Sequence, residues 1–170
     1  NHFETRIMVL EADDEERFSL PENVEKIFIR DNDPVFHHSK YRNYMIKRAS
    51  TELIALWDAD AIGPVNQVVE ACENLRNGQS DLAFPYDGHY YNVPRVIKNV
   101  YKESRSIDAL LFNSNLLRLM HSTYSLGGAI LLNRGIYIKA GMENENFYGW
   151  GPEDYERIIR CEILGYRIKR

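Results

Sequence analysis

Residues 126–160 read LGGAILLNRGIYIKAGMENENFYGWGPEDYERIIR, and this stretch is the centre around which the chain is organised. It joins a double glycine, a short apolar run, a predicted short helix, a tryptophan between glycines and two acids that open a helix. Glycines are needed where a backbone turns tightly or lets another group approach closely. Acids in the first turn of a helix can instead serve only to complement the helix dipole. The rest of the sequence has to show whether these features form a functional site or whether the acids only complement the helix dipole.

Upstream of this stretch, short apolar runs alternate with helical patterns. Buried strands are predicted at 7–10, 26–29, 53–57 and 82–84, and helices at 39–49, after Pro64 and after Pro94. The helix after Pro94 is predicted to carry one stripe that comprises Val96, Val100, Ser104, Ile107 and Leu111. Downstream, Pro152 is placed to open a last helix. Repeated strand–helix units predict an α/β fold with a mostly parallel central sheet flanked by helices.

The composition limits the class of protein. The chain has 170 residues, of which 44% are apolar and 27% charged, as in one globular domain with a buried core. The net charge of −4 gives no basic footprint, so we expect no nucleic acid partner. No apolar run approaches the roughly 20 residues of a membrane helix. We therefore expect a soluble, cytoplasmic protein, with peripheral association at the inner face of the membrane through segments outside this chain as the alternative.

The two cysteines, Cys72 and Cys161, fall in predicted helices and lack a metal-type spacing. We interpret both as buried thiols in a reducing compartment, and a single disulfide is the alternative.

Asp58 and Asp60 follow the apolar strand at 53–57 and precede a Gly-Pro helix start. Side chains two residues apart leave the same side of an extended backbone. Two carboxylates placed in this way can hold a hard divalent cation that bridges to a diphosphate. The same spacing recurs at Asp31 and Asp33, and a solvated turn is the alternative, but the strand and helix around Asp58 and Asp60 favour metal or nucleotide binding.

The acid pair at Glu153 and Asp154 follows Trp150, which stands between two glycines. Helix-dipole complementation would not require that tryptophan or those glycines. A carboxylate at the start of a helix has its charged form favoured and is available as a base near neutral pH. The run therefore predicts a positioned base beside a mobile tryptophan.

Two loops supply further candidates. Glu11 or Asp13, at the carboxyl end of the first predicted strand, lies where open α/β sheets bind ligands, and a solvated loop is the alternative. The loop PYDGHYYNVP at 85–94 carries Tyr86 and His89. Its aromatic side chains either pack locally or shape a sugar pocket, because aromatic faces stack on the apolar faces of sugars.

LWDAD at 56–60, the stretch from Gly127 to Arg160 and LGYRI at 164–168 resemble the inverting nucleotide-sugar glycosyltransferases of the GT-A type. The best match is the galactosyltransferase-like group, with wider similarity to bacterial polysaccharide glycosyltransferases. The likeness covers about residues 40–170 and is most specific between Gly127 and Asp154.

For the donor half of the site, the resemblance implies a role for each matching residue. Asp60 would ligate Mn²⁺ or Mg²⁺ on the donor diphosphate, and Asp58 would contact the ribose or the sugar. Gly127 and Gly128 would line the donor sugar. Asn43 falls near a position that often lies close to the nucleotide in this family.

For the acceptor half, the resemblance implies that Trp150 closes over donor and acceptor, that Glu153 holds an acceptor hydroxyl and that Asp154 is the base. This chain has Pro152 where the family usually has a second glycine, which stiffens the loop but suits a helix start. The family's first strand is not visible before Ile7, and an expected histidine metal ligand would fall after the last residue. We therefore expect residues 1–170 to be a single catalytic domain that is incomplete at both ends.

The expected function is metal-dependent, inverting transfer of a sugar from a UDP-sugar to a hydroxyl of a glycan or lipid-linked acceptor. The enzyme would be a hexosyl- or N-acetylhexosaminyltransferase that acts by one displacement at the anomeric carbon. A nucleotidyltransferase of similar α/β fold is one alternative, although it would not explain the tryptophan and the acid pair. A non-catalytic carbohydrate-binding relative is the other.

Overall fold

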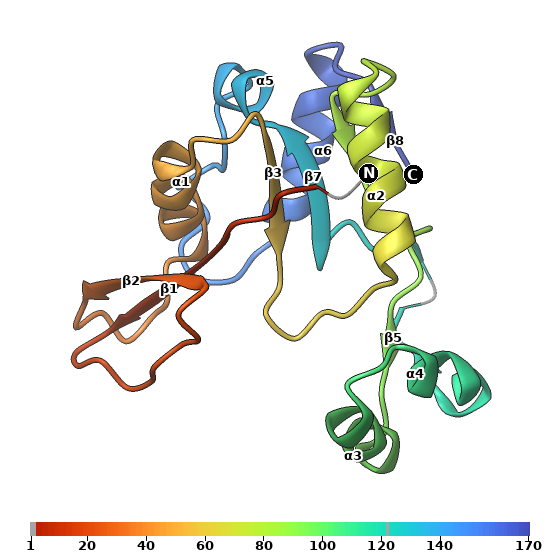
Figure 1. The fold of residues 1–170 in the computed structure, drawn as a ribbon. Helices are drawn as coiled ribbons and strands as arrows, with labels where there is room; N and C mark the ends of the chain where they lie inside the picture. The colour runs from red at the N-terminus through yellow and green to blue at the C-terminus, as the bar shows by residue number, and fades with distance from the viewer. Residues whose placement is uncertain (1–2, 122) are drawn as a thin grey trace.

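The computed structural model describes residues 3–121 and 123–170 as a body of strands and helices from which an arm extends (Figure 1). The strands are β1 (Ile7–Asp13), β2 (Val24–Arg30), β3 (Leu53–Trp57), β4 (Leu82–Ala83), β5 (Tyr91–Asn92), β6 (Arg118–Leu119), β7 (Ala129–Asn133) and β8 (Ile168–Lys169). The helices are α1 (His38–Arg48), α2 (Val65–Arg76), α3 (Arg95–Ser104), α4 (Asp108–Phe112), the 3₁₀ turn η1 (Ser114–Leu116), α5 (Arg134–Lys139) and α6 (Glu153–Ile163).

The central sheet has four strands in the order β3-β7-β4-β8. Strand β7 is antiparallel to both β3 and β4, whereas β4 and β8 are parallel. The mixed helix-and-strand class is confirmed, but the prediction of a mostly parallel sheet does not hold for this sheet. The reason is where the chain re-enters it: Ala129, which begins β7, pairs with Trp57, which ends β3. Strand β7 therefore has to run back along β3.

Helices cover both faces of the central sheet, as predicted (Figure 1). Along β7, successive side chains point to opposite faces. Ile130 and Leu132 pack in one cluster with Ile158 of α6, and Leu131 packs in a second cluster with Leu75 of α2. The continuous apolar run of β7 is thus explained by burial on both sides.

Strands β1 and β2 form a separate parallel pair in register from Ile7 opposite Val24 to Asp13 opposite Arg30. The pair lies below α1 and to one side of the central sheet (Figure 1). Both strands were predicted from their apolar runs. That they form their own sheet could not be predicted, because the apolar pattern of a strand does not specify its partner.

The arm comprises residues 85–120, which hold β5, α3, α4, η1 and β6, and its helices extend away from the end of the central sheet (Figure 1). We predicted an apolar stripe from Val96 to Leu111 on one helix. Instead, Arg105 adopts a left-handed conformation with φ of 53° and ends α3. Val96 and Leu111 are exposed, and Ile97 and Leu110 are buried in their place.

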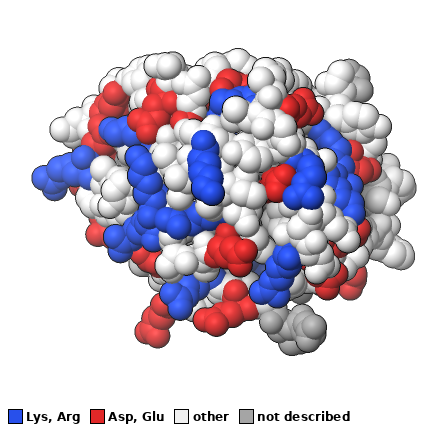
Figure 2. Space-filling model, turned by 90° about the horizontal axis from the view of Figure 1, so that it is seen from above, with Lys and Arg blue, Asp and Glu red and all other residues white. Residues whose placement is uncertain are grey.

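Within the described ranges 3–121 and 123–170, no helix has both the length and the apolar character that crossing a bilayer demands. On the face in Figure 2, the Lys and Arg side chains are interspersed with Asp and Glu. Cys72 and Cys161 are free thiols rather than a disulfide, and burial raises the pKa of each. Cys161 is fully buried and Cys72 partly so.

Candidate active site

The end of β3 lies directly beside the double glycine. The backbone N–H of Asp58 donates to the carbonyl of Gly128 at 2.8 Å. The N–H of Ala61 donates to the carbonyl of Asp58 at 2.9 Å, and the indole of Trp57 donates to the carbonyl of Ala61 at 2.9 Å. These bonds fix the turn that carries Asp58 against the start of β7.

Asp154 reaches the same place from the first turn of α6. A Cβ atom added to Gly127 would lie 2.5 Å from Asp154 Oδ2, so the carboxylate touches the bare backbone of this glycine. The carbonyl of Gly127 also accepts a hydrogen bond from the hydroxyl of Tyr86. Gly127 is therefore required for close approach, since its backbone does not need a positive φ.

Arg42 on α1 joins the two acids. Its Nη2 donates to Asp58 Oδ1 at 3.0 Å, and its Nη1 lies 3.5 Å from Asp154 Oδ1. The Arg42 side chain is buried, whereas the side chains of Asp58 and Asp154 are 39% and 27% exposed, so water reaches the carboxylate side of both ion pairs. Two carboxylates that are 96 positions apart in sequence thus share one guanidinium.

A second, more deeply buried arginine also binds Asp154 Oδ1. Arg157, which is 1% exposed, donates to Asp154 Oδ1 at 2.6 Å and makes two bonds to Glu143, at 2.8 and 3.1 Å. Tyr137 also donates to Glu143. Burial alone would raise the pKa of Glu143, but the charge and hydrogen bonds of Arg157 outweigh burial and lower this pKa. Glu143 is therefore an ionised anchor for Arg157.

Two tyrosines of the arm form a wall beside these acids. Gly128 has φ of +84°, and a Cβ atom there would overlap the ring of Tyr90, whose hydroxyl would lie 2.8 Å away. Burial, together with the charges of Asp58 and Asp60, raises the pKa of Tyr90 to about 12. Burial also raises the pKa of Tyr86. Both phenols therefore stay protonated at neutral pH and can donate hydrogen bonds.

Gly128→Ala should destabilise the protein more than Gly78→Ala. Both glycines have positive φ, which costs another residue about 1–2 kcal/mol. No atom lies within 4 Å of a Cβ at Gly78, whereas at Gly128 the overlap with Tyr90 adds about 1–3 kcal/mol. Urea unfolding of the two variants measures the difference. Equal losses of unfolding free energy would show that Tyr90 moves aside at no energetic cost.

The carboxylate of Glu153 is already bound by nearby groups of the protein. This residue is 3% exposed; its Oε2 accepts from the N–H of Gly151 at 3.0 Å, and its Oε1 lies 3.4 Å from Nδ1 of His38. Burial lowers the pKa of His38, and the charge of Arg42 lowers it further, which favours a neutral imidazole. Trp150, by contrast, is 93% exposed at the tip of the same loop. The loop is thus anchored at Glu153 and presents Trp150 to solvent.

Three candidates lie outside this group. Glu11 pairs with Lys26 at 2.7 Å, and Asp13 pairs with Arg17, so both acids are neutralised within the β1–β2 unit. His89 lies 2.8 Å from Asp87 and is exposed in the arm. The structure does not bring these residues to the cluster around Arg42.

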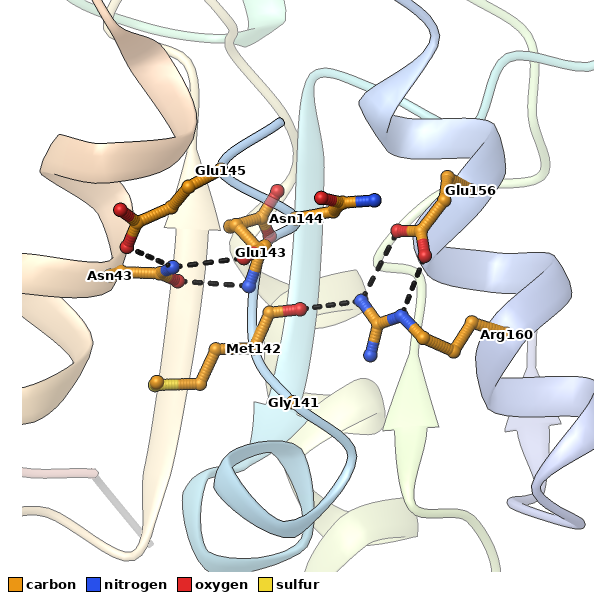
Figure 3. A pocket seen from close by; sticks show the side chains of 8 residues that line it. All are labelled: Asn43, Gly141, Met142, Glu143, Asn144, Glu145, Glu156 and Arg160. Atoms are coloured by element: carbon orange, nitrogen blue, oxygen red, sulfur yellow. Dashed lines mark hydrogen bonds and ion pairs between the residues drawn. The ribbon is translucent and has the colours of Figure 1, made fainter. Parts of the chain in front are cut away.

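Asn43 lines an open pocket of about 420 Å³, which Glu143 and Arg160 also line (Figure 3). Its amide donates to the carbonyl of Glu143 at 2.9 Å and to Glu145 at 2.8 Å, and its oxygen accepts from the N–H of Glu143. On the opposite wall, Arg160 binds Glu156 and the carbonyl of Met142. The contacts of Asn43 are those of a residue that holds the 143–145 loop in place.

Three charged residues of the cluster were not among the candidates chosen from the sequence: Arg42, Glu143 and Arg157. Arg157 could have been found, because it stands three residues after Asp154 on one helix face. Arg42 and Glu143 reach the cluster only through tertiary packing, and the local sequence carries no signal for them.

Asp60 lies at the open edge of the cluster. Its side chain is exposed, but it is near enough to Tyr90 for its charge to affect the pKa of that phenol. Within residues 3–121 and 123–170, no three His, Cys, Asp or Glu side chains converge as a complete metal site. Asp58 and Asp60 thus offer at most an incomplete set of oxygen ligands, open to solvent.

Comparison of the chain with models of known protein families finds no family that matches it. Comparison with functionally characterised proteins likewise finds none with significant similarity.

Proposed function

We propose that this chain is a metal-dependent, inverting glycosyltransferase of the GT-A type, which moves a sugar from a UDP-sugar to a hydroxyl of a glycan or lipid-linked acceptor in polysaccharide biosynthesis. One observation carries the proposal: Asp58 and Asp154 meet at a single guanidinium, that of Arg42, beside Gly127 and Gly128. A donor-binding acid and an acceptor base have to lie this close together, because the transferred sugar passes directly between their substrates.

In this proposal, Asp154 acts as the base. Its Oδ1 is held by Arg157 and Arg42, and its Oδ2 lies against the open backbone of Gly127. A carboxylate fixed in this way can take the proton of an acceptor hydroxyl as the hydroxyl oxygen attacks the anomeric carbon. The bond from that carbon to the donor diphosphate breaks on the opposite side, so one displacement inverts the configuration.

The acids at the end of β3 fit a hard divalent cation. Mg²⁺ is commonly held by one or two carboxylates, with waters and substrate phosphates completing the octahedron. Asp60, exposed and close to Asp58 on the same turn, would be the ligand, with Asp58 oriented by Arg42 toward the donor. When bound, Mn²⁺ or Mg²⁺ would neutralise charge on the departing diphosphate.

The location we propose is the cytoplasm, with lipid-linked acceptors reached at the inner face of the membrane. Two free thiols, one of them fully buried, fit a reducing compartment.

Calorimetric titration with UDP, with and without Mn²⁺, tests the donor half of the proposal. UDP should bind in the presence of Mn²⁺, and Asp60→Asn should remove the enhancement by the metal. Glu70→Gln on α2 is the matched control, because it also removes one exposed negative charge but lies outside the site. A UDP affinity that does not change with Mn²⁺ would overturn the metal-dependent proposal. Release of pyrophosphate from UTP would instead identify a nucleotidyltransferase.

A further inference from the structure

The arm exposes an unusual concentration of apolar side chains. Phe112 is 88% exposed and Val96 is 72% exposed. Six more large apolar residues of the arm are also exposed: Tyr91, Val100, Leu111, Leu116, Leu119 and Met120. Single exposed apolar residues are ordinary, but a group of this size on one extension marks an interaction surface. We call these eight residues the apolar surface of the arm.

The same arm is basic, although the chain as a whole is acidic. The arm, residues 85–120, holds five basic residues and three acidic ones, a net charge of +2, whereas the entire chain carries −4. The five cations, all exposed, are Arg95, Lys98, Lys102, Arg105 and Arg118. Among the described residues none of these five forms an ion pair, whereas Arg42, Arg157 and Arg167 in the body each do. The positive charge of the arm is therefore available to a partner.

We propose that the arm docks on the surface of an anionic phospholipid bilayer. Apolar side chains such as Phe112 would enter the boundary between headgroups and acyl chains, and cations such as Lys98 would bind lipid phosphates. A nucleic acid would neutralise the cations but leave Phe112 and Val96 in water. The apolar surface and the unpaired charge together favour the lipid surface, and this binding does not depend on the transfer reaction.

Co-sedimentation with vesicles tests this docking. The protein should bind vesicles of phosphatidylcholine mixed with phosphatidylglycerol, and bind far less to vesicles of phosphatidylcholine alone. High salt should weaken the binding, because exposed charges are screened. Changing Lys98 and Lys102 to Glu should reduce binding roughly 25-fold or more, since each basic residue near an anionic surface contributes about fivefold.

Two further variants make the result specific to the arm. Phe112→Ser should also weaken vesicle binding, and it cannot act through the core because this side chain is almost fully exposed. Lys139→Glu on α5 removes an exposed cation of the body and should leave binding unchanged. Failure of the unchanged protein to bind anionic vesicles, an equal effect of Lys139→Glu, or stronger capture by DNA than by vesicles would each overturn the proposal. UDP binding, measured separately, should be unchanged in the arm variants. A failure of membrane docking can therefore be distinguished from a failure of the proposed function.

Discussion

Asp154→Asn is expected to abolish sugar transfer while UDP binding in the presence of Mn²⁺ stays nearly intact. An amide cannot accept the acceptor proton, and a positioned acid or base contributes about 10²–10⁴-fold to a rate. Asparagine keeps the size of the side chain beside Gly127 and can still accept a hydrogen bond from Arg157. Release of UDP from the UDP-sugar that the protein binds measures the rate.

Glu156→Gln is the matched control for this variant. Glu156 lies two residues further along α6 and is also ion-paired with an arginine, Arg160, at 2.8 Å. Its replacement should leave the transfer rate unchanged, because it lies outside the cluster around Arg42. A rate for Asp154→Asn equal to that of Glu156→Gln would remove Asp154 from the role of base.

Glu143→Gln is expected to destabilise the fold by about 3–5 kcal/mol. The change leaves the guanidinium of Arg157 buried with Asp154 as its remaining anion, and removing one member of a buried ion pair typically costs this much. Tyr137→Phe removes only one hydrogen bond from the same carboxylate and should cost about 1 kcal/mol. Urea unfolding compares the two, and equal losses would show that the charge of Glu143 is not what holds Arg157.

The stability of the protein at low pH should also depend on Glu143. The pKa of Glu143 is lowered from its ordinary value near 4.5, so the unfolded chain takes up the proton first as the pH falls. Its stabilising contribution is therefore present above about pH 4.5 and is lost as the pH falls toward the lower, folded pKa. The stability of Glu143→Gln should depend less on pH in this range.

Much of the fold could be predicted from the sequence, because local patterns govern the elements. The apolar run at 129–132 became β7, and Pro64 and Pro152 directly precede α2 and α6. The predicted parallel direction was wrong for β7, since the direction of this strand is set by where the long arm returns the chain. The prediction that the apolar stripe of α3 is buried was wrong for a related reason. The stripe was assumed to face a core, but α3 lies on the arm, where Val96 is exposed to solvent.

The predicted site divides in a similar way. Asp58, Gly127, Gly128 and Asp154, chosen from motifs that restrict both spacing and residue type, lie close together in the structure, and their roles stay predictions. Loop acids such as Glu11 were chosen from residue type without a restrictive spacing. In the structure, Glu11 forms an ion pair with Lys26. The cations that hold the acids were missed, because an arginine on a helix carries no sequence mark of the carboxylate it will meet.

Sharing of Arg42 by two acids has a thermodynamic consequence. A ligand that draws Asp58 away from Arg42 leaves this guanidinium to Asp154 and Glu143, and so changes the charge around Asp154 without contacting it. Such coupling is reciprocal, because whatever factor donor binding applies to acceptor affinity, acceptor binding must return to the donor. In the proposed transferase, Arg42 would therefore couple the binding of donor and acceptor.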